Sequence, residues 1–391
     1  MAKRYPSGFI SAFYDPLKNP NAPTIGTATG GDTSASVPFT APGNVGGSAI
    51  TEYNARSTPG DVTASAASSP ISVTGLTNGT AYTFAVWAIN SYGPSAFSAA
   101  SNSVTPAVAP RGVFGGGAGP LNVMDYITIT TTGNAIDFGD LTQSCWYLGS
   151  CSSSTRGIFG GGTTGSITNV IAYVTIATTG NAVDFGDLIP PTNVVASCSS
   201  STRGLFAGGL TTDSGTVSSI DYITIASTGN STDFGNLTVA RYYSGACASP
   251  TRGVFGGGSG TQNVIDYVTI ATTGNATDFG DLLAANDALV GCSSSTRGLF
   301  GGGGGAGQSN VIQYITIAST GNAIDFGDLT VGREQLAACS SEIRGVFGGG
   351  TSPTNVIDYV TIATTGNATD FGDLTVARSG LAGCSSGHGG L

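Results

Sequence analysis

Six cysteines recur at nearly equal spacing and are the first residues in the sequence that could do chemistry. They stand at positions 151, 198, 247, 292, 339 and 384. A ring of thiolates could bind a metal, and neighbouring thiols could form disulfides. Alternatively, each cysteine is one small buried apolar residue of a repeated strand. Inner strands of a six-fold ring stand on the order of 8 to 10 Å apart, beyond the reach of a disulfide, so the sequence favours the apolar role.

Arginine and aspartate recur with the same period. Arginines begin Arg-Gly pairs at 111, 156, 203, 252, 297 and 344, and aspartates precede phenylalanine at 137, 184, 233, 278, 325 and 370. Such residues could bind an anion, but an ion pair repeated in every copy and partly buried is the simpler prediction. The two aspartates of each "DFGD" could hold calcium, yet further oxygen ligands at short spacing are missing.

Other motifs that could indicate an active site lack the further residues that such a site requires. "DFG" occurs six times without "HRD", and no lysine follows Lys18. The glycine runs lack the strand, turn and helix that make a phosphate cradle, so we expect them to let strands crowd near an axis. His388 is the single histidine, which leaves few acid–base or metal schemes. The sequence therefore predicts no catalytic residue, no metal and no cofactor.

The elements that carry these residues are short strands. From Arg111 onward the Arg-Gly pairs follow one another at steps of 45, 47, 49, 45 and 47 residues. Each copy contains four short apolar runs between turns rich in Ser, Thr, Gly and Asn, as in "LAGCSSS", "TRGVFGGG", "NVIDYVTIA" and "NATDFGDL". This pattern predicts six antiparallel sheets of four strands, the blades of a β-propeller.

The repeats resemble the kelch family. A glycine run ends the second strand, tyrosine follows in the third (Tyr267), and an aromatic comes twelve residues later (Phe279), while arginine often precedes the next first strand (Arg241, Arg333, Arg378). Phenylalanine replaces the usual tryptophan, so the repeats are kelch-like. The first copy lacks its first strand, and "LAGCSSG" at 381–387 is an extra one. We expect this strand to pair with residues 111–117 and to close a six-bladed propeller over 108–391.

Residues 20–107 resemble a fibronectin type III domain. Leu76 precedes Tyr82 by six residues, and Phe84, Val86 and Ala88 then alternate inward, which is the arrangement of a tyrosine corner in a β-sandwich. The resemblance implies a spacer module. Residues 1–19 are too short for a core of their own and carry Phe9, Ile10, Phe13 and Tyr14, which predicts a docking arm. The predicted fold class is therefore all-β, a sandwich followed by a propeller.

The copies differ chiefly in two connections. The turns "SSSTRG" and "ATTGN" hardly change, whereas the segments after the glycine run and those from the fourth strand to the next copy do change. In an up-and-down sheet the two variable connections emerge on one face. Loops on a rigid scaffold commonly carry recognition. The side chains suited to binding there are Trp146, Tyr147, Asp213, Tyr242, Tyr243, Asn286, Asp287, Arg333, Glu334 and Gln335.

Charge and composition limit the classes of function. The net charge is −10, and residues 111–391 hold nine arginines, no lysine and nineteen acids, which disfavours nucleic acid as a partner. No long apolar stretch or secretory signal is evident, so membrane insertion is not expected. Copper oxidases built on kelch blades need several histidines, and sialidases need Asp-box turns; both are missing. Catalysis is not expected.

The whole chain resembles a bacteriophage tail fibre or another virion surface protein, made in the host cytoplasm. That resemblance implies other virion proteins as partners of the arm, and a host glycan or protein as the partner of the propeller; further copies of this chain are a third partner class. The alternatives are a bacterial cell-surface adhesin and, less favoured, a carbohydrate-active enzyme.

Overall fold

The computed structural model describes residues 17–391 except 120, 261 and 306. The chain divides into two compact units, Met1–Ala109 and Pro110–Leu391. Within the described residues every regular element is a β-strand, and none of them forms a helix that could span a bilayer. The predicted docking arm, with Phe9, Ile10, Phe13 and Tyr14, lies outside the described residues. The prediction of an all-β chain is confirmed.

The first unit is built from a four-stranded, a three-stranded and a two-stranded sheet, all antiparallel. The strands in the order of the chain are β1 (Thr24–Ile25), β2 (Thr29–Gly31), β3 (Ser34–Val37), β4 (Phe39–Thr40), β5 (Ile50–Thr58), β6 (Thr63–Ala66), β7 (Ile71–Thr74), β8 (Thr83–Asn90) and β9 (Gly93–Pro94).

One apolar core holds the first unit together. Alternate residues of β8, including Phe84 and Val86, are buried against Val37 of β3 and Val73 of β7. Tyr82, the residue before β8, is buried, and its hydroxyl accepts a hydrogen bond from the Thr77 backbone N–H at 3.1 Å. The predicted inward alternation is thus confirmed, and the tyrosine ties a loop to the core as a tyrosine corner does.

The second unit contains six antiparallel sheets of four strands. The first strands are β13 (Gly149–Ser152), β17 (Ala196–Ser199), β23 (Gly245–Ala248), β27 (Val290–Ser293), β31 (Ala337–Ser340) and β35 (Ala382–Ser385). The second strands are β10 (Arg111–Gly115), β14 (Arg156–Gly160), β18 (Arg203–Ala207), β24 (Arg252–Gly256), β28 (Arg297–Gly301) and β32 (Arg344–Gly348).

The outer half of each sheet is formed by the third and fourth strands. The third strands are β11 (Val123–Thr128), β15 (Val170–Thr175), β21 (Ser219–Thr224), β25 (Val264–Thr269), β29 (Val311–Thr316) and β33 (Val356–Thr361). The fourth strands are β12 (Ile136–Asp140), β16 (Val183–Asp187), β22 (Thr232–Asn236), β26 (Thr277–Asp281), β30 (Ile324–Asp328) and β34 (Thr369–Asp373). A short hairpin, β19 (Leu210–Thr211) with β20 (Gly215–Thr216), adds to the third sheet's connection.

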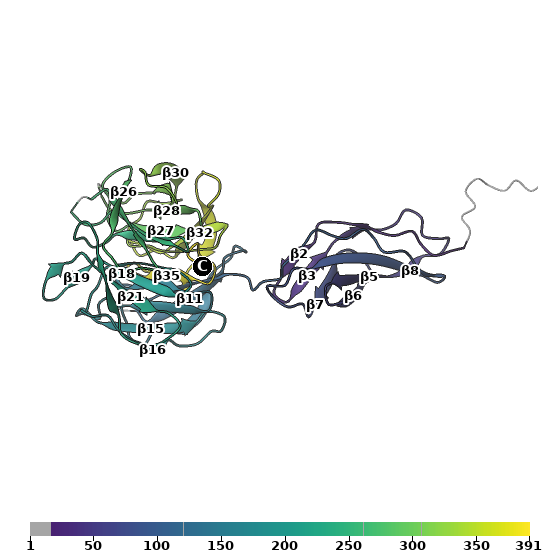
Figure 1. The fold of residues 1–391 in the computed structure, drawn as a ribbon, viewed down its shortest axis with the longest axis horizontal. Helices are drawn as coiled ribbons and strands as arrows, with labels where there is room; N and C mark the ends of the chain where they lie inside the picture. The colour runs from purple at the N-terminus through teal and green to yellow at the C-terminus, as the bar shows by residue number, and fades with distance from the viewer. Residues whose placement is uncertain (1–16, 120, 261, 306) are drawn as a thin grey trace, which may run out of the picture. The chain divides into compact units, whose positions relative to one another are not determined.

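The C-terminal strand completes the sheet formed by β10, β11 and β12. β35 pairs antiparallel with β10, with Cys384 opposite Val113 and Ala382 opposite Gly115. In Figure 1 the yellow end of the chain accordingly lies among the blue and teal strands of residues 111–128. The predicted pairing of residues 381–387 with 111–117 is confirmed.

The first strands contact one another in cyclic order. β13 contacts β17, β17 contacts β23, and the series runs through β27 and β31 to β35, which contacts β13 again. The hydrophobic clusters lie between neighbouring sheets; Phe159 of β14, for example, packs against Gly115 of β10. Each sheet therefore buries its faces against its two neighbours.

The repeated cysteines fill the contacts between sheets. All seven cysteines are free and buried. The Sγ atom of Cys339 lies 2.3 Å from where a Cβ of Gly112 would stand, and the equivalent glycines meet the other repeated cysteines in the same way. Burial raises the pKa of the Cys198 thiol to about 12. The apolar role is confirmed, and it explains why glycine follows each repeated arginine.

The repeated arginines do not pair with the aspartates that precede phenylalanine, so that prediction is wrong. Each guanidinium lies over the tyrosine ring of its own third strand, with the arginine Cζ 4.3 to 4.7 Å from the ring centroid. Each also donates to a backbone carbonyl of the next sheet, as Arg156 does to Ile225 at 2.8 Å. The aspartates are exposed, and among the described residues none forms an ion pair with these arginines. Cation–π contact replaces the expected charge pair.

The constant turns of the repeat cover sheet edges. Gly180 and Ala182 donate backbone hydrogen bonds to Phe138 and Asp140 of the preceding sheet's fourth strand, and Asn181 Oδ1 accepts one from the Asp140 N–H at 3.1 Å. The same contacts recur around the unit. An uncovered edge strand would be open to aggregation, so every "TTGN" turn serves the same structural demand.

The glycine runs serve contact between sheets, which corrects the expectation that they crowd strands near an axis. Gly116 has φ +72°, and a Cβ there would lie 2.5 Å from the carbonyl oxygen of Cys145 in the next sheet's connection. The following Gly117 donates its N–H to that same oxygen at 2.9 Å. A left-handed backbone beside a neighbouring loop favours glycine.

Candidate functional site

Six residues in the fourth-to-first connections form a ring of backbone hydrogen bonds. Each donates its N–H to the carbonyl of the equivalent residue in the preceding sheet, at 2.7 to 3.3 Å, and the ring returns to its start. All six have φ between +51° and +65°, although five of them are not glycine. They are Tyr147, Val194, Tyr243, Ala288, Gln335 and Gly380.

This ring surrounds the mouth of a cavity. The cavity has a volume of about 120 Å³. It is lined by the six ring residues and by the beginning of the first strand of each sheet, which we call the inner strand. Large side chains (Tyr147, Tyr243, Gln335) alternate around the mouth with small ones (Val194, Ala288, Gly380). Because the three large residues come from alternate sheets, their side chains share the opening without clashing.

The large residues contact one another across the mouth. The ring centroids of Tyr147 and Tyr243 lie 5.6 Å apart at 82°, an edge-to-face contact. The Tyr147 hydroxyl donates to the Gln335 Oε1 at 3.2 Å. Burial and a hydrogen bond with Tyr147 raise the pKa of Tyr243 well above its ordinary value, so this hydroxyl stays neutral.

The other predicted aromatics flank this cluster. Trp146 contacts Tyr147, with ring centroids 6.5 Å apart, and Tyr242 contacts Tyr243 at 5.2 Å. Backbone bonds join Trp146 to Thr163 and Tyr242 to Ser259, which places the two kinds of variable connection side by side, as predicted. Four predicted residues therefore form one half-buried aromatic cluster.

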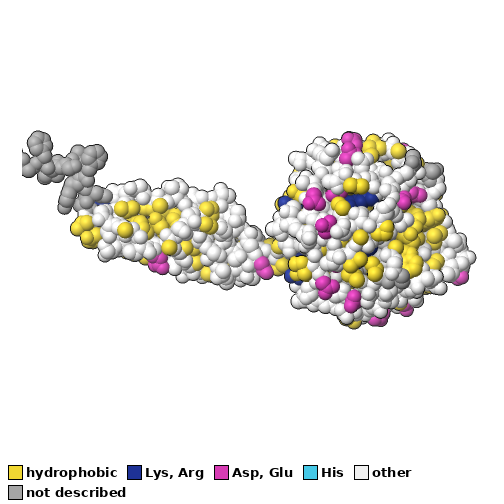
Figure 2. Space-filling model, turned by 180° about the vertical axis from the view of Figure 1, so that it is seen from behind, with side chains coloured by type: hydrophobic (Ala, Val, Ile, Leu, Met, Phe, Trp, Pro, Cys, Tyr) yellow, Lys and Arg dark blue, Asp and Glu magenta, His cyan; other side chains and the backbone are white. Residues whose placement is uncertain are grey.

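The predicted acidic residues lie outside the cavity lining. Asp213 is exposed in the turn between β19 and β20. Asp287 and Glu334 both approach Gly304, whose N–H donates to the Asp287 carbonyl at 2.8 Å. Figure 2 shows one side of the molecule, on which acidic side chains are scattered singly between hydrophobic patches.

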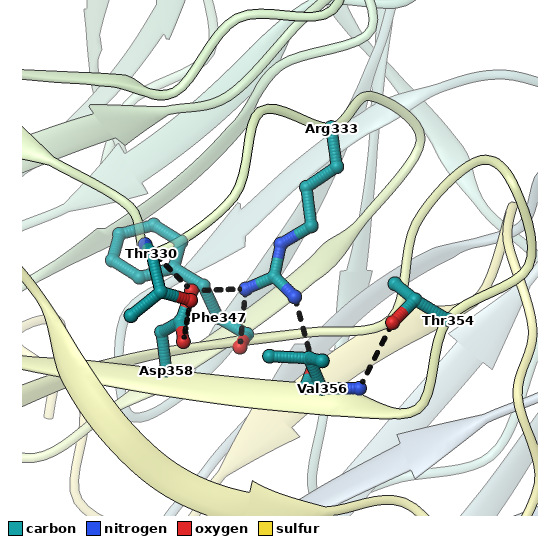
Figure 3. Close-up of polar contacts among 6 residues, drawn as sticks. All are labelled: Thr330, Arg333, Phe347, Thr354, Val356 and Asp358. Atoms are coloured by element: carbon teal, nitrogen blue, oxygen red, sulfur yellow. Dashed lines mark hydrogen bonds and ion pairs between the residues drawn. The ribbon is translucent and has the colours of Figure 1, made fainter.

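Arg333 and Asn286 are not surface ligands, which corrects the prediction for both. Arg333 is 1% exposed, and its Nη2 lies 2.7 Å from Asp358 Oδ2 in β33. It also donates to the carbonyls of Val356 and Phe347, while Thr330 Oγ1 donates to Asp358 (Figure 3). Asn286 occupies the equivalent position in another sheet, where its Nδ2 donates to the Gly302 carbonyl at 2.8 Å.

This buried position distinguishes the six sheets. Arg241, Arg333 and Arg378 pair with Asp266, Asp358 and Asp125, and burial lowers the pKa of each arginine. At the arginine and aspartate positions the other sheets have Asn286 and Gln313, Cys145 and Ala172, and Thr192 and Asp221. A small cavity of about 20 Å³, lined by Cys145 and Ala172, lies in the sheet of β13 to β16, where the ion pair is missing.

Asp221 is the acid without an arginine. Its side chain is buried, and Thr192, at the arginine position, donates its hydroxyl to the Pro190 carbonyl instead. Burial, with a smaller contribution from Asp233, raises the pKa of Asp221 to about 7. Because the folded protein binds this proton more tightly than the unfolded chain does, Asp221 lowers the free energy of unfolding as the pH rises. The loss begins near pH 4, the ordinary carboxyl pKa, and is complete above pH 7.

We expect Asp221→Asn to stabilise the protein at pH 8 and to change little at pH 4. The gain at pH 8 is at most about 4 kcal/mol, since each pKa unit corresponds to about 1.4 kcal/mol. Urea unfolding at both pH values measures it. Asp184→Asn is the control, because Asp184 is the equivalent exposed carboxyl of another sheet and lies opposite Ala172, not opposite a buried acid. Equal effects of Asp221→Asn at the two pH values would contradict this account.

The opposite end of the inner strands is closed by the C-terminal residues. His388 Nδ1 accepts from the Gly390 N–H at 3.1 Å, so its Nε2 carries the proton toward the Ser152 carbonyl at 3.0 Å. Gly389 donates to the Ser293 carbonyl at 3.0 Å. Desolvation lowers the pKa of His388. A second cavity is lined by the six repeated cysteines and His388.

Serine hydroxyls join the inner strands beside this end. Ser152, Ser199, Ser293, Ser340 and Ser385 each donate to a carbonyl of the preceding first strand at 2.7 or 2.8 Å. Ala248 stands at the sixth position, and there Gly390 packs against the Ser199 carbonyl. Sequence reasoning missed both the serine series and the tail; the repeated Cys-Ser pairs were the available signal.

Residues 21–104 match the fibronectin type III domain family. The first unit therefore contains a fibronectin type III domain. No curated protein matches the chain. Within the described residues, no group of three or more His, Cys, Asp or Glu side chains could hold a metal ion.

Proposed function

We propose that the second unit is a six-bladed, kelch-like β-propeller closed by its C-terminal strand. The cyclic contacts of the first strands, the ring of backbone hydrogen bonds and the pairing of β35 with β10 support this. Each four-stranded sheet would be one blade, and the two cavities would lie on the propeller axis.

We propose further that the propeller is a non-enzymatic recognition module. The observation that carries this is the aromatic cluster of Trp146, Tyr147, Tyr242 and Tyr243 beside a cavity mouth. These residues belong to the connections that vary between copies, while the opposite turns are held constant by edge contacts. Aromatic side chains bury a large area with little loss of entropy and suit binding of a sugar ring or a protein hot spot.

The biological setting we propose is the surface of a bacteriophage virion, as a tail fibre or similar appendage. The fibronectin type III domain would be a spacer, the arm would dock on other virion proteins, and the propeller would bind a host glycan or protein. Copies of this chain could assemble together in such an appendage. An adhesin on a bacterial cell surface is the alternative, and a carbohydrate-active enzyme is disfavoured.

Replacing Trp146, Tyr147, Tyr242 and Tyr243 together by alanine is expected to abolish binding to bacterial surfaces. Anchors of this kind contribute about 1 to 3 kcal/mol each, so the combined loss is large even without additivity. Binding of the labelled full chain to a panel of bacterial cells and an array of their surface polysaccharides measures it, and thermal unfolding checks that the variant is folded.

Thr179→Ala with Thr273→Ala is the matched control, since both threonines are exposed in the constant turns. The control should bind as the parent protein does. Normal binding by the folded aromatic variant, or no binding by the parent to any cell or polysaccharide, would contradict the recognition role.

A further inference from the structure

We propose that the sheet of β17, β18, β21 and β22 binds a guanidinium group at Asp221, at the position where three other sheets hold an arginine side chain of their own. This site differs from the aromatic cluster, and its occupation does not depend on the proposed recognition function. The guanidinium comes from outside the sheet, as a small free ligand or as the arginine side chain of a partner protein.

The three buried arginines show which atoms bind a guanidinium in this fold. Arg241 Nη2 donates to Asp266 Oδ2 at 2.9 Å and to the Phe255 carbonyl at 3.1 Å. Its Nη1 donates to the Val264 carbonyl at 3.0 Å. The other two arginines make the same contacts, and Figure 3 shows those of Arg333. Each site therefore consists of one carboxylate and two backbone carbonyls.

The same three acceptors surround Asp221. Asp221 lies opposite Phe206 in the pairing of β18 with β21, which is the register that Asp266 has in its own sheet. Ser219 begins β21 as Val264 begins β25. The acceptors are thus the Asp221 carboxylate and the carbonyls of Phe206 and Ser219. No side chain of a described residue donates a hydrogen bond to any of the three.

The side chains that fill this position elsewhere are replaced here. Thr192 stands at the arginine position: a Cβ on Gly209 would lie 2.6 Å from its Cγ2, and the equivalent glycines meet the buried arginines in the same way. The Thr192 hydroxyl donates to a backbone carbonyl of its own connection at 2.8 Å. Ile189 replaces the threonine that donates to the carboxylate in the arginine sheets, as Thr238 does at 2.6 Å. Asp221 therefore lacks both of the partners that its counterparts have.

Solvent reaches Asp221 but not its counterparts. Asp221 is 8% exposed, whereas Asp125, Asp266 and Asp358 are 0% exposed. The arginine stem covers the carboxylate in those three sheets, and the shorter threonine leaves it open to a small ligand. An arginine extends beyond a threonine by its Cδ and its guanidinium group, and methylguanidinium consists of the same heavy atoms. A ligand of this size therefore matches the missing part of the side chain.

The local charge favours a cation that carries N–H groups. Asp233 lies opposite Asp221 on β22, so two carboxylates stand side by side. The sheet's own Arg203 lies over Tyr222, which projects from the other face of β21. A guanidinium supplies a buried carboxylate with charge and hydrogen bonds together. A metal ion fits less well, because Ca²⁺ takes about six to eight oxygen ligands and no three acidic side chains meet within the described residues.

Calorimetry and thermal unfolding of the full chain at pH 8 test this with methylguanidinium. We expect millimolar methylguanidinium to bind and to raise the unfolding temperature, and tetramethylammonium, a cation without N–H groups, to do neither. A blocked tripeptide with a central arginine separates the two sources: its binding supports a partner's side chain, and binding of methylguanidinium alone supports a free ligand. Binding of neither guanidinium compound, with or without binding of Ca²⁺, would overturn the proposal.

Two variants and a matched control locate the site. Asp221→Asn removes the carboxylate, and Thr192→Arg supplies the guanidinium from the chain itself; each is expected to weaken methylguanidinium binding about tenfold or more. Thr192→Arg should also unfold at a higher urea concentration than the parent protein. Asp184→Asn changes the net charge as Asp221→Asn does, but at an exposed carboxyl of the neighbouring sheet, and should leave binding within about twofold. Unchanged binding by both Asp221→Asn and Thr192→Arg would place the cation elsewhere and overturn the proposal.

Discussion

Deleting residues 379–391 is expected to unfold the second unit at temperatures where the full chain is stable. The deletion removes β35, which pairs with β10 along four residues, together with the buried side chains Leu381, Ala382 and Cys384. It also opens the backbone ring at Gly380 and the serine series at Ser385. The exposed edge of β10 and two uncovered sheet faces together should remove most of the about 5 to 15 kcal/mol that stabilises a domain.

Thermal unfolding followed by circular dichroism measures this loss, and limited proteolysis localises it. Deleting only residues 387–391 is the matched control, because that variant keeps β35 and loses just the tail around His388. We expect the control to melt slightly lower than the parent protein. A 379–391 deletion that melts with the parent would mean that the ring of sheets does not depend on its C-terminal strand.

The arrangement of strands in the second unit could be predicted because the same four-strand pattern recurs in six copies. Period-2 apolar patterns and a step of 45 to 49 residues fix four strands per copy, and the extra "LAGCSSG" has only one unpaired strand to join. Physical reasoning about edges then gives the pairing of β35 with β10. Residues 1–16 are not repeated in the chain, so no comparison between copies is possible for them.

The partners of the repeated arginines could not be deduced in this way. Asp137 and Tyr126 both recur in every copy, so their repetition alone does not say which of them meets Arg111. The register decides it: Arg111 lies opposite Thr128, two residues from Tyr126 on the same face of the sheet, whereas Asp137 lies on the outer strand opposite Asp125. The buried ion pairs occur instead at positions that differ between copies.

The candidate site was predicted in part. Comparing copies identified the variable connections and their aromatic residues, and these meet at one cavity. The ring of six residues with positive φ could not be predicted, because tyrosine, valine, alanine and glutamine rarely adopt a left-handed backbone. Only Gly380 indicates such a conformation from the sequence. Arg333 and Asn286 are buried although they stand in variable connections, where the sequence alone predicts that polar side chains face solvent.

Breaking one buried ion pair gives the second large expected effect. Arg333→Met leaves the Asp358 carboxylate buried with Thr330 as its remaining side-chain partner. Loss of one partner of a buried pair typically costs about 3 to 5 kcal/mol, mostly because a charge stays behind without compensation. The double variant Arg333→Met with Asp358→Leu should recover much of this, since it removes the stranded charge. Urea unfolding of the single and double variants measures both.

The protein itself contains the precedent for this result. At the equivalent position Asp221 has no arginine, and its pKa is raised to about 7 by burial. Where the acid is replaced by Gln313, the arginine position holds the neutral Asn286, and where it is replaced by Ala172, that position holds Cys145. The instability of Arg333→Met should therefore shrink as the pH falls and the stranded carboxyl becomes neutral. A loss that is the same at pH 5 and pH 8, or a double variant no more stable than the single one, would show that Arg333 acts by packing and not by compensating a buried charge.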